Sequence, residues 1–366
     1  MIRWRDGVVT QVGRSWTGAV ELTVLVGEQP VRALAYPELV GTPVAGDRVL
    51  LNVSALDKGL GTGGYALVVA LPDRLPADPP EGGHLVKARY TPLQTMVMGA
   101  DDQESPDHDA LRDADDLFDT PVVVADLHSA LPAVLAGVYE ARPNTRVVYV
   151  MTDGGALPLA FSRTVAALRE ANWLSSTVTV GQAYGGDREA VTVHTGLLTA
   201  VNVLAAELVV LTQGPGNLGT GTRWGFSGVQ SGEAVNAVET LGGRAVASLR
   251  ISEADPRPRH RGISHHSLTA YGRVALRPAD VVVPDLDGEF GDAVRDAAEP
   301  LKARHRVVRV GVDGLYDAMV AAPVKLSTMG RSLDQDRAYF EAAAAAGRHA
   351  ARLVDVPPPG VWSQNS

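Results

Sequence analysis

The chain has 366 residues, of which 45% are hydrophobic and 20% charged, and its formal net charge is −9. This composition is typical of a globular protein with a sizeable core, and the length suits two domains. Because the chain has no cysteine, disulfides, zinc–thiolate sites, iron–sulfur clusters and cysteine nucleophiles are excluded. The acidic balance argues against a general nucleic-acid binder.

No stretch of the sequence has the roughly 20 apolar residues that a membrane span needs, and MIRWRDGVVT at the start lacks the apolar core of a signal peptide. We therefore expect a cytoplasmic protein with neither a membrane nor a nucleic-acid partner. A small molecule, or a further copy of the chain in a homo-oligomer, is the partner that remains.

Residues 1–75 predict a small all-β domain. Short alternating runs, separated by glycine turns and without a helical period between them, are typical of a small barrel or sandwich. The segment DKGLGTGGY, residues 57–65, predicts a hairpin turn, with a lid over the second domain as the alternative. The alternating runs are GVVTQV, AVELTVLV, VRALAY, DRVLLNV and YALVVAL.

Residues 76–119 predict a linker with one or two extra strands. The linker is rich in proline at LPDRLPADPPEGG, HLVKARYTPLQTMVMG has strand character, and the acidic run that follows predicts a loop and a surface helix.

Residues 120–354 predict a doubly wound, mostly parallel α/β domain of Rossmann-like type. Apolar runs too short for helices alternate with segments of helical spacing, which indicates strands buried on both faces of a covered sheet. The alanine-rich DRAYFEAAAAAGRHAARLV predicts a closing helix, and residues 355–366 predict a disordered tail. The strand runs are PVVVADLHS, RVVYVMTDGG, STVTVGQAYGGD, ELVVLTQGPGN, RAVASLRIS, DVVVPDLDG and RVVRVGVDG.

Polar or glycine-rich segments follow five consecutive strands of this domain. Asp126 and His128 follow the first, Asp153 the second, and residues 182–187 the third. A glycine stretch follows the fourth strand, and SEADPRPRHRGISHHS follows the fifth. Because open α/β sheets bind ligands beyond the carboxyl ends of their strands, we expect these segments to surround one ligand cleft.

The glycine stretch, TQGPGNLGTGTRWGFSG at residues 212–228, contains a G-x-G-x-x-G pattern. A dinucleotide fingerprint is disfavoured, because Pro215 removes a backbone donor, the helix begins several residues too late, and the pattern follows the fourth strand instead of the first. No G-K-[ST] follows, which excludes a Walker loop.

The stretch instead predicts a backbone nest for a phosphate or carboxylate, with glycines free to adopt positive φ and a helix N-terminus shortly beyond. The alternative is a ligand-free loop packed into the core by Trp224 and Phe226. The candidate binding residues are Gly214, Gly216, Asn217, Gly219, Thr220, Thr222 and Arg223.

The arginine- and histidine-rich segment predicts a second half of the same site. Arg250 and Arg261 are candidates for clamping an anion by bidentate hydrogen bonds, with internal ion pairs as the alternative. His265 and His266 are candidate general acids or bases. Because the two histidines are adjacent, we expect them to diverge and not to bind one metal ion together.

Asp153 is the third catalytic candidate, as a base or a metal ligand. Together with Asp126, His128 and Asp187 it suggests a divalent cation held by oxygen and imidazole ligands, the one cofactor that the sequence points to. A turn or N-cap role for Asp153 is the alternative.

The strings HLVKARYTPLQ, VMTDGGALP, TQGPGNLGTGTRWGFSG and RPRHRGISHHSLTAYGRVAL resemble a bacterial, largely actinobacterial family called domain of unknown function 3866. The resemblance covers almost the whole chain. It implies a soluble bacterial protein and brings no known reaction with it.

The sequence therefore predicts an enzyme that binds a phosphorylated or otherwise anionic small molecule at the carboxyl ends of the parallel strands, for group transfer or hydrolysis. The alternatives are a non-catalytic metabolite-binding or sensor protein and a structural homo-oligomer.

Overall fold

The computed structural model describes residues 2–79 and 81–354, so the tail expected to be disordered, residues 355–366, lies outside the described residues. The chain divides into two compact units. The first contains the residues up to Val97 together with Ala160–Ala166, and the second contains Met98–Leu159 and the residues from Ala167 onward. None of the described helices is long and apolar enough to cross a membrane.

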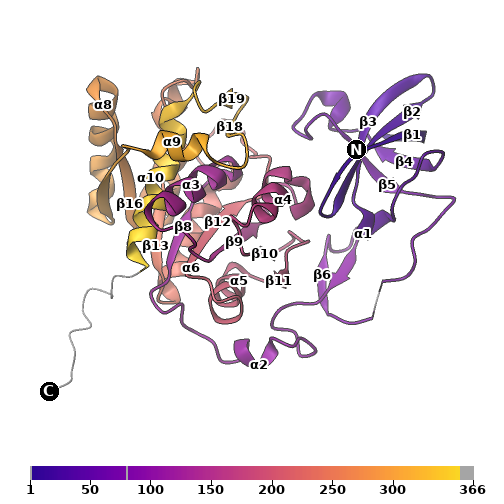
Figure 1. Ribbon diagram of the computed structural model, residues 1–366, viewed down its shortest axis with the longest axis horizontal. Coiled ribbons are helices and arrows are strands. Elements are labelled where there is room, and N and C mark those ends of the chain that lie inside the picture. Colours follow the sequence, from indigo (N-terminus) through magenta and orange to yellow (C-terminus); the bar gives the residue numbers. More distant parts are fainter. Residues whose placement is uncertain (1, 80, 355–366) are drawn as a thin grey trace. The chain divides into compact units, whose positions relative to one another are not determined.

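The first unit is built on a closed five-stranded barrel, which confirms the predicted small β domain (Figure 1). The strand order is β1-β2-β3-β5-β4, with β3 and β5 parallel and the other pairs antiparallel. Alternate residues such as Leu22 and Val24 are buried inside. The strands are β1 (Trp4–Trp16), β2 (Ala19–Val26), β3 (Gln29–Ala35), β4 (Arg48–Asn52) and β5 (Ala66–Ala70), and one helical turn, α1 (Pro37–Val40), follows β3.

A glycine allows β1 to pass close to β2 in this barrel. A Cβ atom on Gly7 would lie 2.6 Å from Val24 Cγ1, which is shorter than any real contact, so a side chain at this position would force the strands apart. After the barrel come a two-stranded hairpin, β6 (Leu85–Lys87) and β7 (Thr95–Val97), and, in the second unit, one helical turn, α2 (His108–Leu111).

The second unit contains an eight-stranded, all-parallel sheet in the order β11-β10-β9-β12-β8-β13-β16-β17, which confirms the predicted α/β fold. Every residue of β8, β9 and β12 is buried, as expected for valine-rich strands that are covered on both faces. The strands are β8 (Pro121–Val124), β9 (Val147–Thr152), β10 (Ser176–Val180), β11 (Arg188–Ala190), β12 (Leu208–Gln213), β13 (Arg244–Ser248), β16 (Asp280–Asp285) and β17 (Arg306–Gly311).

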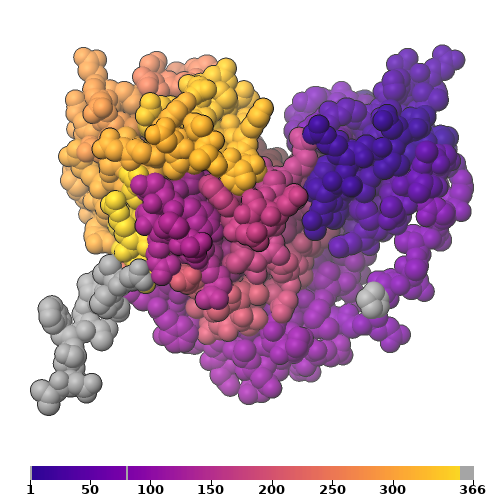
Figure 2. All heavy atoms as spheres, in the orientation of Figure 1, coloured from indigo at the N-terminus to yellow at the C-terminus, as the bar shows by residue number. Residues whose placement is uncertain are grey.

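Helices pack on both faces of this sheet. The helices α3, α9 and α10 pack against one another on one face, and α5 and α6 pack against each other on the other (Figure 1). The magenta surface of α3 meets the yellow surface of α10 in Figure 2. The helices are α3 (Leu131–Ala141), α4 (Arg163–Glu170), α5 (Val193–Leu198), α6 (Gln230–Thr240), α7 (His265–Thr269), α8 (Gly288–Ala298), α9 (Leu315–Val320) and α10 (Arg337–Leu353).

Two of these helices are in backbone contact through glycines. A Cβ atom on Gly137 of α3 would lie 1.9 Å from Ala344 O of α10, and a Cβ atom on Gly347 would lie 1.9 Å from Val134 O. The alanine-rich sequence of α10 therefore serves close helix packing within the chain.

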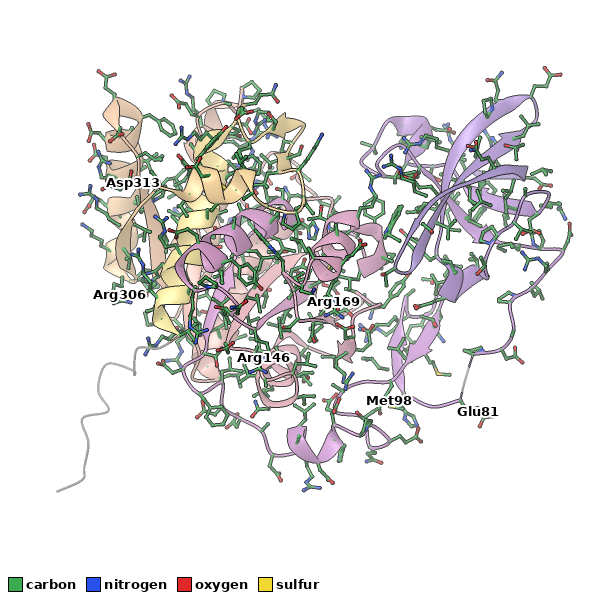
Figure 3. The ribbon with its side chains drawn as sticks, in the orientation of Figure 1. Glu81, Met98, Arg146, Arg169, Arg306 and Asp313 are labelled. Carbon is green, nitrogen blue, oxygen red and sulfur yellow. The ribbon has the colours of Figure 1, made fainter. Side chains whose placement is uncertain are left out.

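The parallel strands define one carboxyl edge. In Figure 3, Arg306, which begins β17, and Arg146, which precedes β9, lie below Asp313, which follows β17, so the carboxyl edge of the sheet is uppermost. Two short hairpins lie in the connections beyond the strands: β14 (Ile251–Ser252) with β15 (Gly262–Ile263), and β18 (Ser327–Thr328) with β19 (Arg331–Ser332).

The strand order reverses between the neighbouring strands β8 and β12. The chain leaves β8 through α3 toward β9 on one side, and leaves β12 through α6 toward β13 on the other. In open α/β sheets, a crevice forms at the carboxyl edge where neighbouring connections diverge in this way. This point is where a ligand site is expected.

Candidate functional site

A small hollow lies at this reversal of strand order, and we call it the strand-end hollow. Its cavity volume is only about 10 Å³, which is room for roughly one water molecule. Its walls come from the ends of β8, β9 and β12 and from the segment that begins α6. The polar side chains that line it are those of Asp126, Thr152, Gln213, Ser227, Gln230 and Ser231.

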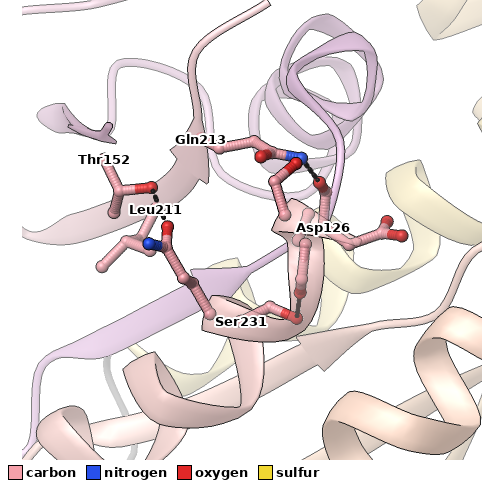
Figure 4. A pocket seen from close by; sticks show the side chains of 9 residues that line it. Asp126, Thr152, Leu211, Gln213 and Ser231 are labelled. Atoms are coloured by element: carbon pink, nitrogen blue, oxygen red, sulfur yellow. Dashed lines mark hydrogen bonds between the residues drawn. The ribbon is translucent and has the colours of Figure 1, made fainter. Parts of the chain in front are cut away.

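Gln213, the last residue of β12, has a fixed amide orientation. Its Nε2 donates to Asp126 O at 2.6 Å and to Asn217 Oδ1 at 3.0 Å. Its Oε1 is buried and has no hydrogen-bond partner among the described residues. On the other side of the hollow, Thr152 Oγ1 donates to Gln230 Oε1 at 3.4 Å (Figure 4). The hollow therefore presents an unsatisfied hydrogen-bond acceptor.

Asp126 lies two residues beyond the end of β8, and its side chain is buried. In Figure 4 its carboxylate points away from the Gln213 amide. Asp126 Oδ2 has no hydrogen-bond partner among the described residues. Burial raises the pKa of Asp126, and the nearby Arg250 guanidinium opposes this by a smaller effect. Such a carboxyl is suited to holding a proton.

The glycine stretch beyond β12 folds largely on itself. Thr220 N donates to Gly225 O at 2.7 Å, and Gly225 N donates to Thr222 Oγ1 at 3.1 Å. The two threonine hydroxyls lie 3.1 Å apart. The hydroxyls of Thr220 and Thr222, which were predicted to bind an anion, therefore form hydrogen bonds within the loop.

The glycines of this stretch play different parts. Gly216 and Gly221 have positive φ values of 94° and 82°, which only glycine adopts easily. Gly214 lies against the neighbouring loop, since a Cβ atom there would be 2.4 Å from Ala156 O. Gly219 forms an isolated bridge with Phe226, which is buried, whereas Trp224 is 56% exposed. Of the two aromatic residues expected to plug the loop, only Phe226 is in the core.

The arginine-rich segment reaches the glycine stretch. Phe226 stacks on His266 with ring centroids 3.8 Å apart, and a Cβ atom on Gly221 would lie 3.9 Å from Arg259 Nη2. The structure thus brings together the two segments that the sequence singled out.

The two arginine candidates differ in environment. Arg250 is buried, and its guanidinium forms an ion pair of 3.5 Å with the buried Asp255. Arg257 also pairs with Asp255, at 2.8 Å, and these partners hold the pKa of Asp255 well below its usual range. Arg250 is therefore part of an internal ion-pair network. Arg223 and Arg261 are exposed.

His260, His265 and His266 form a cluster at the start of α7. One ring nitrogen from each lies within 4.8 Å of the others. The expectation that His265 and His266 diverge is wrong: their ring centroids are 4.4 Å apart, and both rings lie on the side of Phe226, at 6.3 Å and 3.8 Å from its ring. Burial lowers the pKa values of His260 and His266 to about 3, and nearby cations and imidazoles add to the effect.

Asp153 lies at the end of β9 and caps a turn. Its Oδ2 accepts a hydrogen bond from Gln182 N at 2.9 Å, and a Cβ atom on Gly181 would clash with the same carboxylate. The neighbouring Gly155 lies against Gly214. Asp153 is thus at the carboxyl edge, but its carboxylate is engaged in a turn.

Asp187 lies at the opposite edge of the sheet. Its Oδ2 accepts hydrogen bonds from the backbone and hydroxyl of Thr177, near the start of β10, and its Oδ1 pairs with Arg169 at 3.0 Å. The reason is topological: residues 181–187 run back along β10 before β11 begins parallel to it. Asp187 therefore cannot join Asp126 and Asp153 in a metal site, and in the described residues the histidine cluster is the one group with metal-site spacing.

The sequence analysis missed Gln213 and Gln230. Gln213 ends a buried strand, and a polar amide at the end of an apolar run is the signal that marks it. Gln230 begins α6 and carries no signal in the sequence, since only the tertiary structure brings it opposite Thr152.

Two of the strings quoted above, VMTDGGALP and TQGPGNLGTGTRWGFSG, contribute residues to the hollow, whereas HLVKARYTPLQ forms β6 and the turn that follows it in the first unit. A family model described as "Protein of unknown function (DUF3866)" matches residues 32–347, from β3 to α10. The chain belongs to this family. A comparison with curated proteins finds no significant match. The function must therefore be argued from the chemistry of the site.

Proposed function

We propose that the chain is an enzyme that binds a small phosphorylated molecule bearing hydroxyl groups over the strand-end hollow, with one polar group of the ligand inside it, and acts on it by group transfer or hydrolysis. The observation that supports this most directly is that the helical run formed by the turn Ser227–Val229 and α6 begins at the hollow, where the strand order reverses. The first N–H groups of a helix lack intrahelical partners, and the helix dipole places partial positive charge there. A phosphate suits this position.

The unpartnered Gln213 Oε1 supports a hydroxyl-bearing ligand. A buried acceptor without a donor costs about 1–3 kcal/mol, which a ligand hydroxyl would recover. Rotation of the Gln213 amide does not satisfy Oε1, because Nε2 donates hydrogen bonds to Asp126 O and Asn217 Oδ1 and holds the amide in this orientation. An anion without a donor group leaves Gln213 unsatisfied.

Charge and proton chemistry support the rest of the proposal. The exposed Arg223, Arg259 and Arg261 lie on the two segments beside the hollow and favour an anionic ligand. Asp126 contributes to the wall of the hollow while its carboxylate is buried and points away from the Gln213 amide, and its raised pKa marks a perturbed carboxyl group next to the proposed site.

Gln230→Glu tests the binding site. The substitution keeps the side-chain shape and the acceptor for Thr152, and adds a negative charge where the phosphate would bind. Calorimetry should use sugar phosphates, phosphoserine and nucleotides as probes, with inorganic phosphate and an unphosphorylated sugar as references. Gln11→Glu adds the same charge on the exposed face of β1 and is the matched control.

At least one organic phosphate should bind the wild-type chain more tightly than either reference. Gln230→Glu should weaken that binding at least about tenfold, and Gln11→Glu should leave it unchanged. Binding by no probe, or equal effects of the two substitutions, would overturn the proposed site. Mass spectrometry of the bound compound with water and with an alcohol acceptor tests catalysis, and an unchanged compound would leave only a binding protein.

A further inference from the structure

The proposed function leaves the histidine cluster unused. We propose that His260, His265 and His266 bind one divalent transition-metal ion. The three ring nitrogens lie within 4.8 Å of one another, and all three residues come from a single segment at the start of α7. Three imidazoles are a common ligand set for zinc and its neighbours in the first transition row.

Unsatisfied nitrogens point to a ligand at this place. His265 Nε2 and His266 Nδ1 are buried and have no hydrogen-bond partner among the described residues. Buried polar atoms are nearly always paired, so two orphaned imidazole nitrogens in one cluster call for an explanation. A metal ion coordinated by the lone pairs of these two nitrogens would explain why neither has a hydrogen-bond partner.

His260, the third proposed ligand, is oriented by a hydrogen bond. His260 Nδ1 lies 2.7 Å from Ser264 Oγ, which also accepts from His266 N at 3.2 Å. In the tautomer in which His260 Nδ1 carries the proton, Nδ1 donates to Ser264 Oγ. This tautomer leaves the Nε2 lone pair for a metal, the same role that outer hydrogen bonds play in known histidine sites.

The surrounding structure holds the rings in place. The parallel stack of Phe226 on His266 fixes one ring, and the N-cap hydrogen bond of Ser264 fixes the start of α7. Zinc–nitrogen bonds of about 2.0–2.1 Å place tetrahedral ligand nitrogens about 3.3 Å apart, so nitrogens that now lie within 4.8 Å of one another approach by up to about 1.5 Å on binding. Magnesium and calcium, which prefer oxygen ligands, do not suit the cluster.

Positive charge around the cluster sets the nature of the fourth ligand. Arg250 and Arg259 both act electrostatically on His265 and His266. A dication bound among these guanidinium groups is favoured when an anion occupies the open position, because the anion offsets the repulsion. We therefore expect the metal and an anion to bind cooperatively.

Titration of untagged, chelator-stripped protein with Co²⁺ tests the site. His265→Ala removes one ligand from a half-buried position, and His266→Phe removes another while keeping a ring to stack on Phe226. His194→Ala, at an exposed position of α5, is the matched control. Circular dichroism checks that each variant is folded.

The wild-type chain should bind one Co²⁺ ion with the visible absorption of four-coordinate cobalt. His265→Ala and His266→Phe should weaken binding at least about 100-fold, since even outer-sphere partners change affinity 10–100-fold. His194→Ala should have no effect, and azide should tighten binding and shift the spectrum. No Co²⁺ or Zn²⁺ binding by the wild-type chain, or the same loss in His194→Ala, would overturn the proposal.

The outcome is independent of the proposed function. The cobalt titration uses no phosphorylated compound, and calorimetry with organic phosphates is done in the presence of chelator. Metal binding without phosphate binding would therefore contradict only the proposed function. Phosphate binding without metal binding would contradict only the proposed metal site.

Discussion

Replacement of Asp126 by asparagine should remove a pH dependence from the stability of the parallel-sheet unit. The folded protein raises the pKa of this buried carboxyl above its ordinary value of 3.8. Between the unfolded and folded pKa values, the folded chain holds a proton that the unfolded chain releases. Asp126 therefore contributes most to stability below the unfolded pKa, and this contribution is lost as the pH rises through the folded pKa.

The size of the effect follows from linkage. One proton corresponds to about 1.4 kcal/mol per pH unit, so the free energy of unfolding of the wild-type chain should fall at about this rate relative to Asp126→Asn between the two pKa values. The pKa values of Glu239 and Glu341 are also raised by burial, but both residues are present in the two proteins and cancel in the difference.

Urea denaturation, followed by far-ultraviolet circular dichroism at a series of pH values from 4 upward, measures this difference. The helical signal reports mainly on the parallel-sheet unit, where the long helices lie. A difference that stays flat with pH, or that favours the wild-type chain more as the pH rises, would refute the reasoning. The second result would mean that Arg250 stabilises an ionised carboxylate.

Two further predictions concern packing and buried charge. Gly137→Ala should lower the free energy of unfolding by about 2–3 kcal/mol, because the new Cβ would overlap Ala344 O, whereas Gly311→Ala, with open space around it, should change it by less than about 0.5 kcal/mol. Equal urea midpoints for the two variants would contradict this. Asp255→Asn should cost about 3–5 kcal/mol, since it leaves the buried Arg250 charge without its partner, and a thermal midpoint close to that of the wild-type chain would argue against it.

Local patterns were enough to predict the fold class. The runs around Val122, Val148 and Val209 are apolar on both faces of a strand, and only a covered parallel sheet buries both faces. The alternating runs before residue 75 bury one face each, which is the pattern of a small barrel. Both predictions depend on periods of two to four residues, which are readable without any tertiary contact.

The candidate site was predictable only in part. The glycine stretch and the segment around His265 were singled out by composition, and both lie at the carboxyl edge in contact with each other. Asp187 was misplaced because its loop runs back to the amino edge, a path that seven residues of loop sequence do not encode. For Arg250 the sequence left a ligand clamp and an internal ion pair open, and its partner in the structure is Asp255.

The sequence by itself determined the two kinds of β structure, the class of the larger unit and the strand ends that carry polar residues, because these follow from local periodicity. Only the tertiary structure decided that β12 lies beside β8, which places the start of α6 and Gln213 at one hollow. It alone also turned His265 and His266 toward His260. Strand order and rotamer choice depend on packing between distant segments, and no local pattern records that packing.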